Sequence, residues 1–529
     1  MDKEPEDRRT ADTKSYEDDD SLVTPVTSLQ DLRHVYGDEW QSPKSRYDKL
    51  AIKFRSRFGR DPTFFARSPG RVNLIGEHID YSLFPVMPMA IDRDIVIAVA
   101  TSLSSTQHPT ITVTNTNGKY PEREFQHSSR NKGYVEIDPK MHDWANYFKC
   151  GYKGVFEELQ LGEAFDMMVM VDGTVPSAAG VSSSSALVCC SALATAIANG
   201  KTMNKSRLTQ TAIQSERYAG VQIGGMDQSS SIMGIAGSAL FIDFYPNLKV
   251  NPITLPKPNP PPVFVIANTL VTSDKHITAP TNYNLRVVEC RMAAALLAHL
   301  VGVSVTLTDS KDKEVLKPTT LRNVAEEYFK RKVGQGTKYP TGSKFEDWAP
   351  EVLSIEIHMS PTKIDQLFIN NLTIHAEKFN LKLRAIHVLA ESKRVYQFRD
   401  VCAGKPPSTG LENVLNDIGK LMNDSQASCK SNFECSCPEL DDLAALARES
   451  GAYGSRLTGA GWGGCTVSLI TADQVDSFIE KIKEGYYFKK WPEWRDDAET
   501  NQTLRDAIFA SKPFAGAFVV KNNEKLYSC

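Results

Sequence analysis

Four consecutive serines stand directly before a run of strong helix formers in residues 176–199, which read PSAAGVSSSSALVCCSALATAIAN. Glycine and serine are poor helix formers, whereas the Ala- and Leu-rich run that follows is a good one. The pattern predicts a loop that delivers its backbone N–H groups into a helix from Ser184 to Asn199. Such a helix start carries unpaired donors and partial positive charge, which favour phosphate. A serine-rich helix cap without a ligand stays open as the alternative for this segment.

Short apolar and β-branched runs bounded by Gly, Pro or Asp predict strands on both sides of this helix. They cover residues 64–76, 85–91, 94–102, 165–173, 263–269, 454–458, 465–470 and 515–521. Apolar positions at helical spacing predict a helix near residues 45–59 and several long helices before Leu446. The order of strands and helices is mixed, without a repeat or a regular βαβ alternation, so the fold class is α+β.

At 529 residues and 58.7 kDa the chain is too long for a single core, and two domains are expected. The proline-rich stretch LPKPNPPPV at 255–263 is the candidate boundary. It gives an N-terminal domain at 26–255 and a C-terminal domain at 256–529. The acid-rich residues 1–25 predict a disordered tail, because they cannot bury enough apolar surface to offset the entropy of ordering. Residues 308–361 are polar and predict an irregular peripheral insertion.

The formal net charge of -3 argues against a general nucleic-acid or membrane-surface binder. No apolar run reaches the roughly eighteen residues of a membrane span, and the first residues lack the apolar segment of a signal peptide. Cys429, Cys435 and Cys437 form the densest group of thiols, but they lack the second ligand pair of a zinc finger. Reduced thiols in a cytoplasmic protein, without nucleic-acid or membrane partners, are therefore expected.

Residues 67–81 read RSPGRVNLIGEHIDY and place Arg71, Glu77, His78 and Asp80 between apolar flanks. Charged side chains are rarely buried without partners. Several acceptors around a glycine suit a ligand with many hydroxyl groups, because one carboxylate can accept two hydroxyl hydrogens. A solvated turn with a local Arg–Glu pair is the structural alternative. Metal binding is disfavoured, because these ligand types lack the i, i+4 spacing of a helical metal site.

Two further glycine-containing segments carry candidate chemistry. The segment GGMDQ places Asp227 after two glycines, where it is either a ligand-facing acid or a simple helix N-cap. A G-x-G-x-x-G pattern begins at Gly459, but a strand (CTVSLI) follows where a dinucleotide-binding fingerprint needs a helix. The pattern instead predicts a hairpin turn whose glycines allow close approach of a ligand or another loop. The P-loop sequence G-x-x-x-x-G-K-[ST] does not occur.

These motifs together resemble one family. RSPGRVNLIGEHIDY resembles the galactokinase signature, GVSSSSAL the second motif of the GHMP small-molecule kinases, and GSRLTGAGWGGC their third motif. WANYFKCG and NYNLRVVECR also match, and SNFECSCPELD is similar to eukaryotic members of fungal type. The likeness extends from about Asp31 to Val520. It implies a two-lobed fold, with a ribosomal-protein-S5-like N-terminal domain, a ferredoxin-like C-terminal domain and an active site in the cleft between them.

The resemblance implies a kinase that transfers the γ-phosphoryl group of ATP to the C1 hydroxyl of galactose, with Mg²⁺. Asp227 would accept or hold the hydroxyl proton, and Arg71 would stabilise Asp227 and the transferred phosphoryl group. The sugar-binding residues would be Glu77, His78, Asp80, Gly224 and Tyr283. The ATP-binding residues would be Trp144 at the adenine and, at the phosphates, Gly180, Ser182, Ser183 and Ser184. The metal ligands would be Ser184 and Glu216.

The resemblance leaves two alternatives open. The GEHIDY and ECSCPELD stretches are also similar to N-acetylgalactosamine kinases, which differ in the room for a 2-acetamido group. The family further includes fungal sensors that bind galactose and ATP and signal to a transcriptional repressor protein. Those sensors can lose residues of the second motif, and the intact serine run therefore favours catalysis. Gln426 stands where many relatives have a histidine, and Glu216 is one residue closer to Asp227 than is usual, which makes it the weaker metal ligand.

Overall fold

A computed structural model describes residues 25–26, 32–36, 40–104, 108–141, 143–220, 224–272, 279–303, 319–333, 374–376, 378–405, 411–495 and 500–522. The predicted tail at 1–25 lies outside these ranges apart from residue 25, and so does the predicted insertion at 308–361 apart from residues 319–333. Those residues include a helix, α9 (Leu321–Val333), where irregular structure was predicted. Leu321, Val324, Ala325 and Phe329 are buried at helical spacing, which explains the helix.

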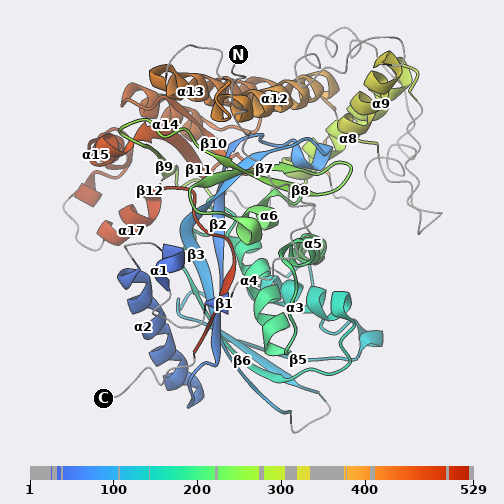
Figure 1. Cartoon of the computed structure of the whole chain (residues 1–529), viewed down its shortest axis with the longest axis vertical. Coiled ribbons are helices and arrows are strands. Elements are labelled where there is room, and N and C mark those ends of the chain that lie inside the picture. The colour runs from blue at the N-terminus through green and yellow to red at the C-terminus, as the bar shows by residue number, and fades with distance from the viewer. Residues whose placement is uncertain are drawn as a thin grey trace, which may run out of the picture.

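A seven-stranded sheet forms the lower part of the molecule in Figure 1, in the order β1-β13-β2-β3-β6-β4-β5. Neighbours pair antiparallel except β1 with β13 and β4 with β6. The strands are β1 (Pro25–Val26), β2 (Phe64–Ile75), β3 (Met87–Ser102), β4 (Thr110–Asn115), β5 (Arg123–Gln126), β6 (Asp166–Gly173) and β13 (Phe518–Lys521).

Strand β3 replaces two strands that the sequence pattern predicts at 85–91 and 94–102, and the prediction of an interruption was wrong. The polar residues between them form a register shift opposite Pro69 and Arg71 of β2, where the partner changes from Asp94 to Ala90. A β-bulge accommodates extra residues without ending a strand. The buried Asp94 side chain is neutralised there by Arg46 and Arg67.

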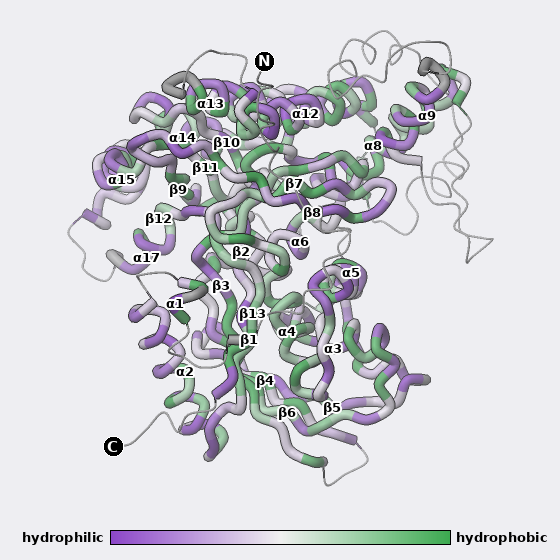
Figure 2. The backbone as a smooth tube through the Cα atoms, viewed as in Figure 1, coloured by the Kyte–Doolittle hydropathy of each residue, from purple (hydrophilic) through white to green (hydrophobic). Residues whose placement is uncertain are grey.

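Helices cover both faces of the large sheet. Side chains alternate between the faces of a strand, so Phe65 of β2 packs with α2 (Gln41–Phe58), whereas Phe64 and Ala66 join the core that contains α4. The helices of this second face are α3 (Ala145–Leu159), α4 (Ser183–Ala198), α5 (Lys205–Glu216) and α6 (Met226–Met233). Helix α4 is largely hydrophobic (Figure 2) and buried on nearly all sides, as its composition requires.

A smaller antiparallel sheet lies above the large one in the order β10-β11-β9-β12 (Figure 1). Its strands are β9 (Pro262–Asn268), β10 (Gly454–Thr458), β11 (Cys465–Thr471) and β12 (Ile508–Ser511). Apolar residues of α14 (Pro438–Glu449), α15 (Val475–Ile482) and α17 (Thr500–Ala507) cover one face. The remaining elements are α1 (Arg33–Tyr36), α8 (Tyr283–Leu300), α12 (Leu381–Cys402), α13 (Leu411–Ser428), α16 (Phe488–Lys490), β7 (Ser238–Asp243) and β8 (Lys249–Thr254).

The proline-rich stretch joins β8 to β9, where the chain passes toward the small sheet. The division at residue 255 stays a prediction. The last described strand, β13, returns to the large sheet and pairs with β2, so both ends of the chain contribute to that sheet. Within the described part of the chain, no helix combines the length and the apolar character that crossing a membrane requires.

Candidate active site

One pocket contains all seven residues that were predicted to act on the sugar or to bind it. Its lining residues come from segments beside the large sheet and from segments beside the small sheet. They come from β2, the loop after it, the start of α6 and the start of α8, joined by the turn after β10. The lining residues are Arg71, Glu77, His78, Asp80, Gly224, Gly225, Met226, Asp227, Tyr283, Gly459 and Ala460.

Arg71 and Asp227, two of the lining residues, form an ion pair. The Nε atom of Arg71 donates to Oδ1 of Asp227 at 2.8 Å, and its Nη2 atom lies 2.7 Å from the same oxygen. The Nη1 atom donates to the carbonyl oxygen of Gly180 at 2.6 Å. Both side chains are almost fully buried, and opposite charges at this distance favour the charged carboxylate. One guanidinium group therefore joins the acid to the serine-rich loop.

The serine-rich loop ends in α4, which begins at Ser183, one residue before the predicted start. Ser182 adopts a left-handed conformation with φ 63°, and its hydroxyl oxygen is buried without a hydrogen-bond partner among the described residues. The loop meets the turn between β10 and β11, where a Cβ atom on Gly464 would lie 2.7 Å from the carbonyl oxygen of Ala179. The prediction that these glycines allow another loop to approach is confirmed.

Ser184 and Glu216, the predicted metal ligands, lie together beside the start of α4. The Ser184 hydroxyl donates to Oε1 of Glu216 at 3.3 Å. Ser185 donates to the same oxygen at 2.9 Å and lies 3.5 Å from Oδ2 of Asp227. The Gln228 amide donates to the other Glu216 oxygen. Mg²⁺ prefers a few oxygen ligands together with substrate phosphates, and one hydroxyl and one carboxylate at a phosphate-binding helix start fit that preference.

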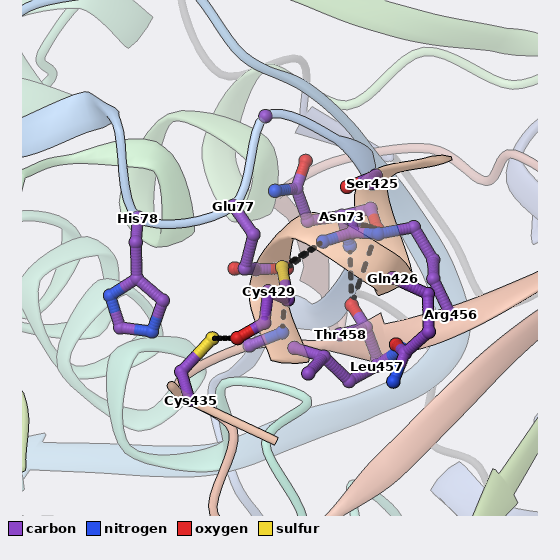
Figure 3. A network of polar contacts seen from close by, with 12 residues as sticks. Asn73, Glu77, His78, Ser425, Gln426, Cys429, Cys435, Arg456, Leu457 and Thr458 are labelled. Carbon is purple, nitrogen blue, oxygen red and sulfur yellow. Dashed lines mark hydrogen bonds and ion pairs between the residues drawn. The ribbon is translucent and has the colours of Figure 1, made fainter. Parts of the chain in front are cut away.

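Glu77 belongs to a buried network of polar contacts that includes Arg456 (Figure 3). Its Oε2 accepts hydrogen bonds from Nη2 of Arg456 and from the backbone N–H of Gly459, both at 3.1 Å. Burial raises the pKa of Glu77 to about 7, although Arg456, Arg71 and the Gly459 N–H act in the opposite direction. The carboxyl group therefore changes its charge near neutral pH.

His78 lies on the same loop in a left-handed conformation, with φ 59°. Its Nε2 donates to the carbonyl oxygen of Ala460 at 2.8 Å, and Nδ1 lies 3.1 Å from the Tyr81 hydroxyl. The ring also packs 4.9 Å from Phe433 and 5.4 Å from Tyr283, measured between ring centroids. Both ring nitrogens lie within hydrogen-bond distance of protein groups, and the role of His78 in binding the sugar stays a prediction.

Asp80 and Gly224 face one another so closely that a Cβ atom on Gly224 would overlap the Asp80 carboxylate. Position 224 therefore requires glycine, because its backbone lies against the Asp80 carboxylate. Tyr283 starts α8, and its hydroxyl lies in the same environment: burial and the nearby carboxylates of Asp80 and Asp227 raise the pKa of Tyr283 well above its usual value. The three residues line one side of the pocket.

Trp144, predicted to contact adenine, precedes α3 and is not among the residues that line this pocket. Its indole N–H donates to the carbonyl oxygen of Pro121 at 2.9 Å, and its ring centroid lies 5.8 Å from that of Tyr120. The ring is partly exposed. Its role at the adenine stays a prediction.

Sequence reasoning missed several residues that support the site. Arg456 is fully buried in β10, and a charged residue within an apolar strand pattern could have signalled it. Ser185, the last of the four serines, could have been chosen for its place in the motif. His387 and Glu391 of α12 contact the loop that carries Glu77. Their sequence neighbourhood carries no comparable signal.

Comparison with known proteins gives matches over most of the chain. Residues 52–101 match the galactokinase galactose-binding signature, residues 146–235 the GHMP kinases N terminal domain and residues 410–487 the GHMP kinases C terminal domain. A curated galactokinase of Dictyostelium discoideum is 40% identical over 484 residues, which cover 89% of this chain and 92% of that protein. A Saccharomyces cerevisiae galactokinase is 38% identical over 501 residues, covering 88% and 93%.

The crystal structure of Lactococcus lactis galactokinase complexed with galactose has the same fold, with a TM-score of 0.63. The match has 21% sequence identity and covers 89% of this chain and 99% of that one. Fold and domain matches together define a two-lobed GHMP kinase of the α+β class. Given the identity over nearly its full length to curated relatives, the chain belongs to the galactokinase family.

Proposed function

We propose that this chain uses ATP to phosphorylate the C1 hydroxyl of galactose, with galactose 1-phosphate and ADP as products. Membership of the galactokinase family makes it an ATP-dependent sugar kinase. The observation that carries the assignment of the site is the placement of Arg71, which donates at once to Asp227 and to the Gly180 carbonyl. A hydroxyl-binding pocket and a phosphate-binding loop thereby meet at one guanidinium group.

Asp227 is proposed to accept the C1 hydroxyl proton, or to hold it during in-line attack on the γ-phosphorus. Arg71 contacts Oδ1 of Asp227, and the Ser185 hydroxyl lies 3.5 Å from Oδ2, the oxygen proposed to meet the C1 hydroxyl. The Arg71 guanidinium also offsets negative charge that develops on the transferred group. Proximity and electrostatic stabilisation then supply most of the rate enhancement, as phosphoryl transfer requires.

Galactose hydroxyls are proposed to bind to Glu77, His78, Asp80, Tyr283 and the backbone at Gly224. The carboxylates are buried, line the pocket and can accept hydroxyl hydrogens. The ATP phosphates are proposed to lie at Gly180 and Ser182 to Ser184, where the start of α4 offers unpaired N–H groups. Adenine is proposed to lie against Trp144.

Ser184 and Glu216 are proposed to hold Mg²⁺ together with the ATP phosphates, because their oxygens lie 3.3 Å apart at the loop. A bound Mg²⁺ would supply charge neutralisation at the phosphates. Both Glu216 oxygens accept hydrogen bonds, from Ser184, Ser185 and Gln228, and these keep the carboxylate directed toward the loop.

An ADP-release assay across a panel of hexoses tests the function. Galactose is expected to be turned over at least tenfold faster than N-acetylgalactosamine at equal subsaturating concentration. Equal or greater turnover of N-acetylgalactosamine would overturn the choice of substrate, and absence of ADP release with every hexose would overturn the assignment as a kinase. Chelation of Mg²⁺ with EDTA should abolish turnover, and added Mg²⁺ should restore it.

A second role, binding to a transcriptional repressor when galactose and ATP are bound, rests on the resemblance to fungal sensors alone. A repressor pull-down that depends on both ligands would establish this role beside the catalytic one.

We place the reaction in the cytoplasm, supported by the use of ATP and by the described cysteines, which are free thiols.

A further inference from the structure

Helix α12 presents three polar side chains on one face toward the sugar-binding loop. Arg384, His387 and Glu391 are spaced by three and four residues, which places them on the same side of a helix. Arg384 donates to Glu289 of α8 at 2.7 Å and to the carbonyl oxygen of Asn432 at 2.6 Å. Arg384 thereby fixes α12 to α8, the helix that starts with the pocket residue Tyr283. His387 and Glu391 contact the loop that carries Glu77.

Glu391 is fully buried, and its carboxylate accepts four hydrogen bonds. Oε1 accepts from the backbone N–H groups of Gly76 at 2.9 Å and Glu77 at 3.2 Å, and from the Ser425 hydroxyl at 2.6 Å. Oε2 accepts from Nε of Arg394 at 2.7 Å. Burial alone would raise the pKa of Glu391, but Arg394 and Arg456 hold it well below the usual value. The group is therefore a charged acceptor near pH 7.

His387 contacts the other side of the same peptide. Its Nε2 donates to the carbonyl oxygen of Glu77 at 3.0 Å, and Nδ1 accepts from the Ser428 hydroxyl at 2.9 Å. Burial lowers the pKa of His387 to about 4, so the ring is neutral near pH 7. The N–H and the C=O of Glu77 are thus both bound by α12.

The loop also lies directly on the helix. Gly76 has φ +102°, and a Cβ atom there would lie 3.0 Å from Cγ2 of Val395, one turn beyond Glu391. The Glu77 side chain is bound separately, by Arg456 and the Gly459 N–H at the turn after β10. The main chain of Glu77 is therefore held by α12, and its side chain is held by β10 and the turn after it. A small shift of α12 or of this turn would move the Glu77 carboxylate in the pocket.

We infer that Glu391 is a positioning residue for sugar binding, which acts through the backbone N–H groups of Gly76 and Glu77 to place the Glu77 carboxylate in the pocket. Glu391 is not among the residues that line this pocket. Supporting contacts of this kind hold binding groups within fractions of an ångström of the productive geometry. The inference rests on the proposed function, because it takes the Glu77 carboxylate as a ligand of the sugar.

The test compares Glu391→Gln with the wild type in full steady-state kinetics. Loss of the charge weakens the hydrogen bonds that Glu391 accepts from the N–H groups of Gly76 and Glu77. Because the Glu77 carboxylate is then held less precisely, the KM for galactose should rise at least tenfold. The kcat and the KM for ATP should stay within about threefold, because Arg71, Asp227 and the phosphate loop do not contact Glu391. Glu391→Asp keeps the charge but places the carboxylate one carbon farther from the two N–H groups, so it should also raise the KM for galactose. This variant replaces Glu391→Gln in the test if Glu391→Gln does not fold.

A matched control separates positioning from general loss of stability. Val401→Ala truncates a buried residue in the last turn of the same helix. It should lower the melting temperature at least as much as Glu391→Asp and leave the KM for galactose unchanged. A similar rise of KM in both variants would mean that α12 acts only as a structural support, and it would overturn the inference.

A double-mutant cycle identifies the route of the effect. If Glu391 acts through Glu77, Glu77→Gln with Glu391→Gln should bind galactose no more weakly than Glu77→Gln alone. Additive losses, or a Glu391→Gln enzyme with the wild-type KM for galactose, would overturn the inference while the proposed function stands. A wild-type chain that releases no ADP with galactose would instead overturn the proposed function, and this inference with it.

Discussion

Gly459 lies so close to Gly180 that a Cβ atom on Gly459 would overlap the carbonyl oxygen of Gly180. This same oxygen accepts the hydrogen bond from Arg71 Nη1. The turn after β10 and the phosphate loop before α4 therefore meet backbone to backbone, beside the ion pair between Arg71 and Asp227. The turn belongs to the small sheet, whereas the phosphate loop leads into α4, which packs on the large sheet. The geometry of the candidate site therefore depends on how closely Gly459 approaches Gly180.

Gly459→Ala is expected to raise the KM for ATP at least tenfold, because the new methyl group displaces the Gly180 carbonyl. Gly459 also has φ +86°, so part of the cost is backbone strain, about 1–2 kcal/mol of stability. Gly451→Ala is the matched control: Gly451 has φ +113° with nothing within 4 Å of the added atom. It should lose similar stability with an unchanged KM for ATP. Equal kinetic effects in both variants would contradict the proposed contact.

Asp227→Asn should lower kcat by roughly 10²- to 10⁴-fold, the range expected for removal of an acid–base group. The amide keeps the shape of the side chain and can still accept from Arg71, so the galactose Kd should change little, whereas loss of the charge beside the buried Arg71 should lower the melting temperature. ADP release, thermal melting and calorimetric titration with galactose check the three quantities. Asp243→Asn in β7, outside the pocket, serves as control. Turnover near the wild-type rate would exclude the role of Asp227.

Gly224→Ala should weaken galactose binding at least tenfold, because the added Cβ atom would displace the Asp80 carboxylate. The KM for ATP should stay near its wild-type value. In Gly118→Ala the added atom meets nothing within 4 Å, so that variant should behave as wild type. If Gly224→Ala binds galactose normally, Asp80 is either not a sugar ligand or tolerates the displacement.

Galactose affinity is expected to rise with pH through about pH 7. The raised pKa of Glu77, about 7, means that the carboxyl group is protonated below this pH and charged above it. If only the charged form accepts the sugar hydroxyls, the galactose Kd should fall about tenfold between pH 6 and pH 8. Titration calorimetry at constant ionic strength measures this change. In Glu77→Gln the dependence should vanish, and its persistence would assign it to another group.

Asp94→Ala should destabilise the protein by about 3–5 kcal/mol, the cost of leaving a buried charge unpaired. Asp94 is fully buried between Arg46 and Arg67, which hold its pKa below the usual value even though burial acts to raise it. Asp61→Ala removes an exposed partner of Arg55 and should cost less than about 1 kcal/mol. Urea unfolding of both variants compares the two losses. A small loss for Asp94→Ala would show that water or rearrangement satisfies both arginines.

Much of the local structure followed from the sequence. The start of α4 was predicted to within one residue, and the hairpin at 454–471 was predicted from glycines followed by a strand. These features depend on capping, propensity and turn geometry, which act over a few residues. The split of β3 was predicted wrongly, because the strand continues through Asp92 and Arg93 by a register shift against β2, which a local sequence pattern does not reveal.

The sequence by itself determined the family and the chemical character of the motifs: a helix start suited to phosphate, a cluster of acids suited to hydroxyl groups, and a glycine-rich hairpin. Only the tertiary structure decided that Arg71 bridges Asp227 and Gly180, that Gly224 makes room for Asp80, and that α12 holds the loop of Glu77. The reason is physical. Residue types define which interactions a side chain can make, whereas burial and the pairing of distant segments decide which of them it does make.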